Sequence, residues 1–97
     1  MSKVAALSQS KIEKELSTLP NWSVKSGKLH AEFRFKDFVE AFAFMTKVAF
    51  AAESAQHHPE WSNVYNRVTI DLVTHDADNA ISHLDVELAR QIDTLAT

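Results

Sequence analysis

The sequence contains no cysteine and a single glycine in 97 residues. Without cysteine the chain offers no thiolate nucleophile, no disulfide and no cysteine-bound zinc. With Gly27 as its only glycine it also lacks the glycine-rich loop that binds phosphates and the Gly-x-Ser-x-Gly turn of α/β-hydrolases. Histidine is therefore the side chain best suited to proton chemistry at neutral pH, and 5 histidines are present.

The sequence also has no long hydrophobic run and no excess of basic charge. No apolar stretch approaches the roughly 18 residues that span a bilayer, and the N-terminus lacks the apolar core of a secretory signal, so we expect a cytoplasmic protein that binds no membrane. The 10 Lys and Arg residues against 13 Asp and Glu give a net charge of -3, which disfavours direct binding to nucleic acid. The length predicts a single domain over residues 1–97.

Hydrophobic residues at spacings of three and four predict three helices. Each has a start signal, a Ser or Asp followed three residues later by a carboxylate: Ser10 with Glu13, Asp37 with Glu40, and Ser82 with Asp85. The helices are expected from Ser8 or Ser10 to Thr18, from Asp37 to Gln56 or His57, and from Ser82 onward. The second helix is apolar over more than one face, which predicts a contact with another subunit in a homodimer or homotetramer.

Apolar and polar residues alternate in two regions, and each region predicts a β-hairpin. The first hairpin covers residues 22–35 and turns at Ser26-Gly27, and the second covers residues 62–75 and turns near Asn66-Arg67. By parity, His75 is expected on the same face of its strand as Thr69 and Asp71. The order αββαββα predicts an α+β fold, with a four-stranded antiparallel sheet, three helices on one face and a polar opposite face.

His57, His58 and His75 are the candidate catalytic residues. Pro59 cannot continue the preceding helix and favours an extended conformation for His58, so the two adjacent imidazoles should point in different directions. One of them and His75 come from separate elements and could flank a small molecule. Two imidazoles on opposite sides of a ligand suit an elimination of water, in which one removes a proton and the other protonates the departing hydroxyl.

Other interpretations of these residues stay open at this level. His57 and His58 can serve as helix-end or turn residues. Glu53, His57 and His75 offer ligands for zinc, although no His-Glu-x-x-His pattern is present. A Ser-His-Asp triad is possible by composition alone. Trp22 and Trp61 are most simply core or rim residues, and a tryptophan beside a cleft can also stack on a planar heterocycle.

The same window resembles the pattern of the pterin-4a-carbinolamine dehydratase family. That pattern combines an acidic residue, His-His-Pro, an aromatic residue, a further histidine and an aspartate at set separations. The matching residues here are Glu53, His57-His58-Pro59, Tyr65, His75 and Asp85. Similarity within residues 35–38, 41–49 and 61–66 extends the resemblance over residues 22–95. The loop after His75 departs from the pattern, because many members have a glycine there.

The resemblance implies removal of water from a 4a-hydroxytetrahydropterin to give the quinonoid dihydropterin. It implies a pterin substrate, neither a metal nor another cofactor, and a functional link to an aromatic amino-acid hydroxylase, whose spent cofactor is that carbinolamine. His57 and His75 would exchange protons with the substrate, and His58 would orient the pterin ring. The other implied site residues are Glu53, which would orient His57, Pro59, which would rigidify the turn, Trp22 and Trp61, which would wall the pocket, and Asp85, a helix cap first and a site residue second.

A second function of a different class accompanies the resemblance. Some family members bind a homeodomain transcription factor and stabilise its dimer. That role would use the apolar helix over residues 37–56 and not the histidines. A third interpretation keeps the dehydratase pocket but assigns it to another pathway, such as molybdopterin-related metabolism.

Overall fold

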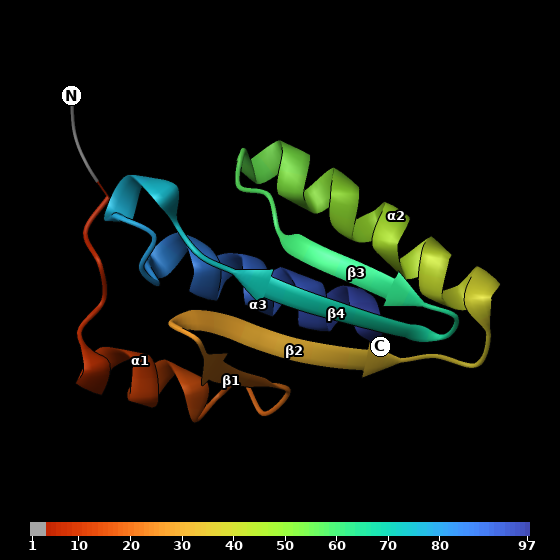
Figure 1. Cartoon of the computed structure of the whole chain (residues 1–97), viewed down its shortest axis with the longest axis horizontal. Coiled ribbons are helices and arrows are strands. Elements are labelled where there is room, and N and C mark those ends of the chain that lie inside the picture. Colours follow the sequence, from red (N-terminus) through yellow and green to blue (C-terminus); the bar gives the residue numbers. More distant parts are fainter. Residues whose placement is uncertain (1–3) are drawn as a thin grey trace.

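A computed structural model describes residues 4–97, which form a four-stranded antiparallel sheet with three helices on one face (Figure 1). The strand order is β1-β2-β4-β3, so the two hairpins meet through their second strands. The predicted fold class and element order are confirmed, with one short 3-10 helix in addition. In chain order the elements are α1 (Gln9–Leu16), β1 (Trp22–Lys25), β2 (Lys28–Arg34), α2 (Phe38–Ala55), β3 (Glu60–Val64), β4 (Arg67–Leu72), η1 (His75–Ala77) and α3 (His83–Ala96).

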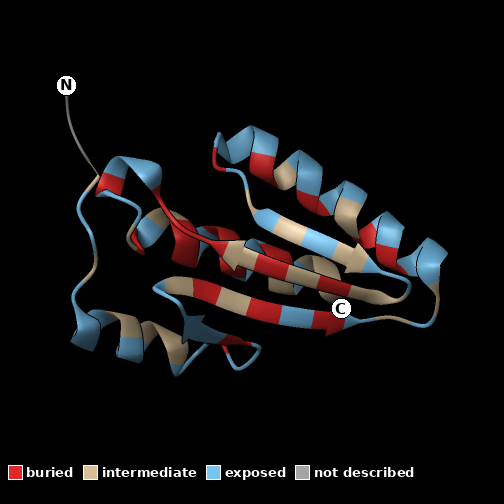
Figure 2. Cartoon of the chain, in the orientation of Figure 1, coloured by how far each residue is buried: buried red, intermediate tan, exposed pale blue. Residues whose placement is uncertain are grey.

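The two central strands place their alternate apolar side chains against the helices. Because directly opposite residues of an antiparallel pair share a face, this register builds one continuous apolar surface. The buried cross-strand pairs are Leu29 with Leu72, Ala31 with Ile70, and Phe33 with Val68. The residues between them are polar and face away from the helices, so burial alternates along β2 and β4 (Figure 2).

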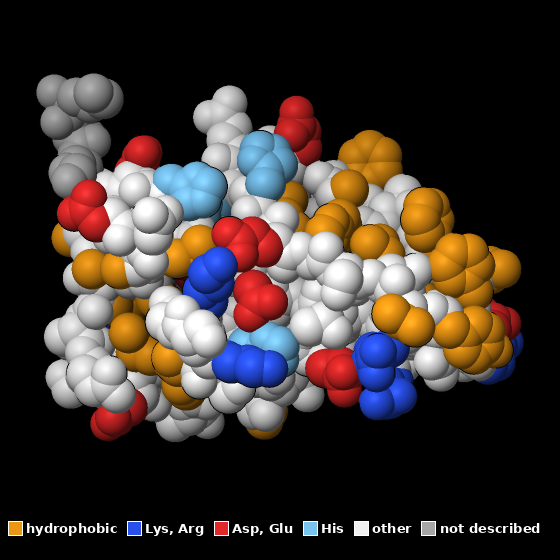
Figure 3. Space-filling view, in the orientation of Figure 1, with side chains coloured by type: hydrophobic (Ala, Val, Ile, Leu, Met, Phe, Trp, Pro, Cys, Tyr) orange, Lys and Arg blue, Asp and Glu red, His pale blue; other side chains and the backbone are white. Residues whose placement is uncertain are grey.

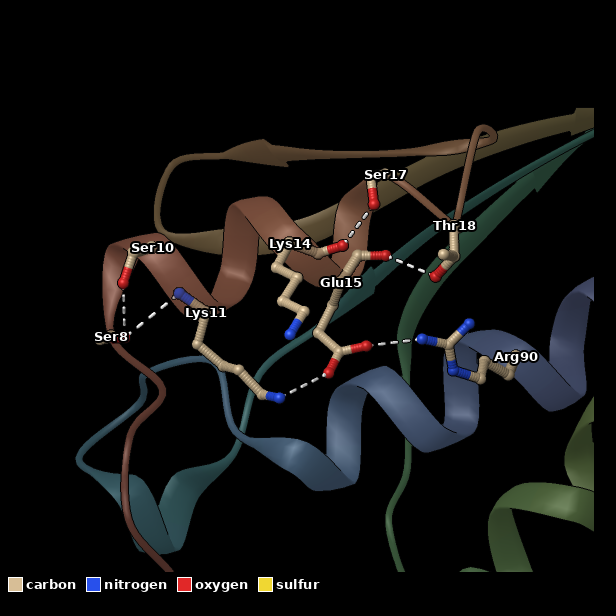
Figure 4. A network of polar contacts seen from close by, with 8 residues as sticks. All are labelled: Ser8, Ser10, Lys11, Lys14, Glu15, Ser17, Thr18 and Arg90. Carbon is tan, nitrogen blue, oxygen red and sulfur yellow. Dashed lines mark hydrogen bonds and ion pairs between the residues drawn. The ribbon is translucent and has the colours of Figure 1, made fainter.

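The helices cover that apolar surface with their buried stripes. On α3 the stripe includes Leu88, Ala89 and Ile92, and α2 packs against both α3 and β4. The small buried Ala41 and Ala52 of α2 allow a close approach to its neighbours. The helix α1 contributes partly buried apolar residues to the edge of the core, and polar contacts join it to α3 (Figure 4).

Two of the predicted helix starts need correction. The N-cap of α1 is Ser8, whose hydroxyl accepts a hydrogen bond from the Lys11 backbone N–H at 3.2 Å, so the predicted Ser10 capping box is wrong. At α2, Asp37 does cap the helix, but the Glu40 carboxylate accepts from the backbone N–H of Lys36 instead of Asp37. The capping box at the start of α3 is confirmed.

Several predicted element ends also need correction. Helix α1 ends at Leu16 and not at Thr18, and α2 ends at Ala55, followed by a left-handed Gln56. The second hairpin turns one residue earlier than expected, with Tyr65 at a φ of 51°. Strand β4 ends at Leu72, so the parity argument that placed His75 on the face of Asp71 does not apply. None of the helices within residues 4–97 is both long and apolar enough to cross a membrane.

Candidate active site

The end of α2 directs His57 into the protein. Gln56 adopts the left-handed conformation, with φ 52° and ψ 39°, and the His57 backbone N–H then donates to the Ala52 carbonyl at 3.0 Å. This 6→1 hydrogen bond is characteristic of a Schellman motif, in which the chain reverses past the helix end. The reversal leaves His57 only 9% exposed, although the residues on either side of it are solvent-exposed.

A buried carboxylate fixes the ring of His57. The His57 Nε2 atom lies 2.5 Å from Oδ1 of Asp85, a residue of α3 that is 0% exposed. The other carboxylate oxygen, Oδ2, accepts hydrogen bonds from the Ser82 backbone N–H at 2.9 Å and from the Thr74 hydroxyl at 2.8 Å. Asp85 is therefore both the helix cap that the sequence predicts and the direct partner of a candidate catalytic histidine.

His58 has a different environment from its neighbour. Its Nε2 atom lies 2.8 Å from Oε1 of Glu53, and the two side chains are 63% and 82% exposed. The prediction that Glu53 orients His57 is therefore not met, because Glu53 contacts His58. The physical reason is that the helix ends two residues before His57, which removes His57 from the i, i+4 position on the Glu53 face.

His75 reaches the same region from the other side. It begins η1 directly after Thr74, whose backbone forms a bridge to Ala80 and closes the loop. A cleft of about 200 Å³ lies between these segments. Its lining residues are Gln56, His57, His58, Val73, His75, Asp76 and Leu84. Histidine side chains reach the surface on this rim, where α2 ends and η1 begins (Figure 3).

The two tryptophans and the proline occupy other places. Trp22 is 5% exposed and belongs to the hydrophobic core, where its indole N–H donates to Asp93 at 2.8 Å. Trp61 is half-buried on β3 opposite Ile70, on the helix-covered face of the sheet. Neither tryptophan lines the histidine cleft, so the structure does not place them as pocket walls. Pro59 is half-buried and lies in the sequence between His58 and Glu60, the first residue of β3.

The zinc interpretation finds no ligand set in the structure. Among the residues at 4–97, no three His, Asp or Glu side chains come together in a way that could hold a metal ion. The His57 Nε2 atom contacts Asp85, and Glu53 contacts His58, so the proposed trio of Glu53, His57 and His75 does not converge on one point. The imidazoles that line the cleft are groups that can exchange protons with a bound molecule.

A second hollow, also of about 200 Å³, lies on the open face of the sheet. Its charged groups already pair with one another: His30 Nδ1 lies 2.8 Å from Asp71 Oδ1, and Lys28 Nζ lies 2.5 Å from Glu60 Oε1. The hydrogen bond to Glu60 raises the pKa of Lys28. The histidine cleft is the better candidate active site, because three imidazoles from two segments line it, whereas His30 is the one imidazole among the residues that line the second hollow.

Sequence reasoning missed two residues that support the site. Thr74 belongs to no motif in the sequence, and Ser82 is predicted only as a helix cap, yet both are buried and both donate a hydrogen bond to the Asp85 carboxylate. The capping box was the available signal for Ser82. For Thr74 the only sequence signal is its position directly before His75. Its contact with Asp85 of α3 depends on the tertiary fold.

Comparisons with known proteins identify the family of the chain. The family described as Pterin 4 alpha carbinolamine dehydratase matches residues 5–95. The chain belongs to this family. Membership identifies it as a dehydratase, a hydro-lyase. Residues 5–95 contain every residue that lines the histidine cleft, and also Asp85, the buried partner of His57.

Individual relatives cover nearly the full length. The chain is 60% identical over 89 residues to a protein of Synechococcus sp. (strain WH7803) assigned as a pterin-4-alpha-carbinolamine dehydratase, covering 92% of this chain and 95% of the relative. A protein of Solibacter usitatus (strain Ellin6076) with the same assignment is 53% identical over 90 residues, covering 93% of this chain and 94% of the relative.

Solved structures extend the comparison. A transcriptional coactivator/pterin dehydratase from Brucella melitensis superposes with a TM-score of 0.89 at 39% identity, covering 95% of this chain and 99% of that one. A pterin dehydratase-like protein identified as a RuBisCO assembly factor in the alpha-carboxysome has a TM-score of 0.64 at 22% identity, covering 77% of this chain and 86% of that one. The second likeness shows a shared fold alone.

Proposed function

We propose that this dehydratase removes water from a 4a-hydroxytetrahydropterin and releases the quinonoid dihydropterin. The observation that carries the proposal is the convergence of three imidazoles, from the end of α2 and from η1, on one cleft of about 200 Å³. The substrate would be the spent cofactor of an aromatic amino-acid hydroxylase, so the reaction would belong to tetrahydropterin recycling.

The chemistry needs one acid and one base. A protonated imidazole gives its proton to the 4a-hydroxyl, the C4a–O bond breaks, and water leaves. A neutral imidazole takes the N5 proton, and the N5 electron pair forms the C4a=N5 double bond. We assign these two roles to His57 and His75, which approach from opposite segments, and we assign the orientation of the ring edge to His58 with its partner Glu53. General acid–base catalysis of this kind contributes roughly 10²–10⁴-fold in rate.

The test is a direct assay of purified protein. A hydroxylase generates 4a-hydroxytetrahydropterin in the cuvette, and the disappearance of its absorbance is followed with and without the protein. We expect at least tenfold acceleration over the uncatalysed rate, and we expect the same acceleration after treatment with EDTA. No acceleration would contradict the proposed reaction, and loss of activity with EDTA would point to a metal-dependent mechanism.

We also propose that the outer face of α2 joins copies of this chain into a homodimer or homotetramer. Val39 and Phe50 are each 75% exposed, Phe42 is 55% exposed and Phe38 is 49% exposed. Hydrophobic side chains gather over this helix in Figure 3. Exposed aromatic residues along one helix are typical of a surface that another protein covers.

Sedimentation analysis tests this second proposal. The natural chain should sediment as a dimer or tetramer, and Phe42→Glu combined with Phe50→Glu should shift it to a monomer. Val24→Glu is the matched control, because Val24 is 46% exposed on β1, away from α2. A natural chain that stays monomeric at high concentration would contradict self-association and would leave a different protein, such as a transcription factor, as the partner of this face.

A further inference from the structure

Two buried hydroxyl groups continue the contact between His57 and Asp85 into the protein. The Thr74 hydroxyl donates to Asp85 Oδ2 at 2.8 Å, and it lies 2.6 Å from the Ser82 hydroxyl. The Ser82 hydroxyl in turn accepts from the Leu84 backbone N–H at 3.1 Å. We call Thr74 and Ser82 the hydroxyl chain. Thr74 is 2% exposed and Ser82 is 0% exposed.

We propose that the hydroxyl chain positions the base of the reaction: through Asp85, it holds His57 with its proton on Nε2 and its lone pair on Nδ1. This inference rests on the proposed dehydratase function and goes beyond it by naming two supporting residues, one ring nitrogen and the direction of proton transfer. Thr74 and Ser82 touch no substrate in this scheme and act only through Asp85.

Counting the protons gives a unique arrangement. A hydroxyl has one proton to donate. The single proton of Thr74 points to Asp85, so Ser82 must be the donor in the contact between the two hydroxyls. The Ser82 oxygen then accepts only from the backbone at the start of α3, where the Leu84 N–H donates to it at 3.1 Å. Every hydrogen bond along the hydroxyl chain therefore points toward the Asp85 carboxylate.

The same count places the proton of His57. Asp85 Oδ2 receives two donors, the Thr74 hydroxyl and the Ser82 backbone N–H, so the carboxylate is already an acceptor on that side. A carboxylate that only accepts requires a proton on the His57 Nε2 atom, 2.5 Å from Oδ1. In the neutral ring Nδ1 then carries the lone pair, and within residues 4–97 Nδ1 has no hydrogen-bond partner. His57 is thereby the base that takes the N5 proton, and the more exposed His75 supplies the acid.

Thr74 also connects the two halves of the cleft. Its side chain bonds to Asp85, and its backbone bonds to Ala80 and to the N–H groups of Ala77 and Asn79 in the segment that carries His75. A single residue therefore fixes both the partner of His57 and the start of η1. The side-chain oxygens of Thr74, Ser82 and Asp85 all have hydrogen-bond partners, so this group is satisfied as it stands.

Removing one hydroxyl tests the positioning role. Thr74→Val keeps the shape of the side chain and its backbone contacts but removes one of the two donors that hold Asp85 Oδ2. We expect kcat for dehydration to fall about tenfold with little change in KM, because the interaction serves the transition state and not ground-state binding. Thr74→Ser restores the hydroxyl, so its kcat should return to within about threefold of the natural value.

A second pair of variants separates positioning from stability. Ser82→Ala removes the N-cap of α3 and breaks the hydroxyl chain. Ser8→Ala removes the N-cap of α1, whose hydroxyl also accepts from a backbone N–H, but it lies outside the cleft. Both variants lose a helix cap, so both should unfold at lower temperature. Only Ser82→Ala should lower kcat under conditions where both proteins remain folded.

Nuclear magnetic resonance reads the proton position without any substrate. In protein labelled with ¹⁵N-histidine, the natural chain should show the His57 proton on Nε2, protected from exchange with water. That signal should be lost to exchange in Thr74→Val and Ser82→Ala and retained in Thr74→Ser and Ser8→Ala. A proton on Nδ1 in the natural chain would overturn the proposal. So would an unchanged signal and unchanged kcat in Thr74→Val and Ser82→Ala. If the natural chain shows no dehydratase activity, the proposed function fails, and the spectra still decide the proton placement.

Discussion

The environments of two adjacent histidines differ because their carboxylate partners differ in burial. His57 pairs with Asp85, which is 0% exposed, whereas His58 pairs with Glu53, which is 82% exposed. A buried carboxylate restricts its partner to one geometry, while an exposed pair is screened by water and contributes little to stability. We therefore infer that His57 is held rigidly and that His58 can adjust to the substrate.

Asp85→Asn should be strongly destabilising. The amide NH2 group of asparagine must face either His57 or the Thr74 hydroxyl and the Ser82 backbone N–H. Those groups donate to Asp85, so a donor would face a donor on whichever side the NH2 group lies. We expect the free energy of unfolding in urea to fall by about 2–4 kcal/mol, the range for breaking a buried charged network. Asp93→Asn is the control on the same helix, because its remaining oxygen can still accept from Trp22. Equal losses in the two variants would contradict a special role for Asp85.

At this scale the sequence identifies residues better than it identifies their partners. His57, His58 and His75 could be predicted as a group because Pro59 interrupts a helix beside them and a second hairpin follows. The partner of Glu53 could not be predicted, because a contact between Glu53 and His57 at i, i+4 requires a helix that continues through His57. The Asp85 contact with His57 spans 28 positions and depends on the packing of α3 against the end of α2, which no local pattern encodes.

Element ends were predicted well where a local signal and the tertiary contacts agree. At α3 the serine and the aspartate three positions later indicate the start that the structure shows. At α1 two serines compete, and the backbone N–H of Leu7 bonds to the Ile81 carbonyl just before Ser8, which fixes the earlier start. The left-handed Gln56 could not be predicted, because glycine is the usual signal for that conformation. The sequence predicts a strand that continues to His75, whereas β4 ends at Leu72. Val73 and Thr74 beyond its end are still buried.

The contact between α1 and α3 predicts an acid-sensitive contribution to stability. Lys11 Nζ lies 3.2 Å from one Glu15 oxygen and Arg90 Nη2 lies 2.6 Å from the other (Figure 4). The hydrogen bond from Lys11, assisted by Arg90, lowers the pKa of Glu15 from its ordinary 4.5. A carboxylate with a lowered pKa in the folded state stabilises the protein above its unfolded pKa, and the stabilisation is lost as pH falls through the folded value.

Glu15→Gln should therefore unfold at slightly lower urea concentration than the natural chain at pH 7, and the difference should vanish once the pH falls below the lowered folded pKa of Glu15. The effect should be small and should shrink in high salt, because the pair is solvent-accessible. Glu13→Gln on the same helix serves as the control, because the one side-chain partner of the Glu13 carboxylate within residues 4–97 is Gln9. A difference between Glu15→Gln and the natural chain that grows toward acid pH would contradict this assignment.

For the whole molecule, the sequence predicts the element order and the layers but not the order of strands. Two hairpins can join through any of their edges. The observed centre, β2 beside β4, follows from burial, because these strands carry the continuous apolar pairs while β1 and β3 have few buried residues. The arrangement also brings the end of β4 and the end of α2 to one side of the sheet, which creates the cleft (Figure 1).

The central claim is that imidazoles from these two segments exchange protons with one bound pterin. The most direct measurement is kcat for dehydration in His57→Ala, in His75→Ala and in the double variant, each checked for intact fold by circular dichroism. We expect each single variant to lose at least tenfold, and we expect the double variant to lose less than the product of the two, because the acid and the base act in one step. A double variant that dehydrates the substrate as fast as the natural chain would contradict the account.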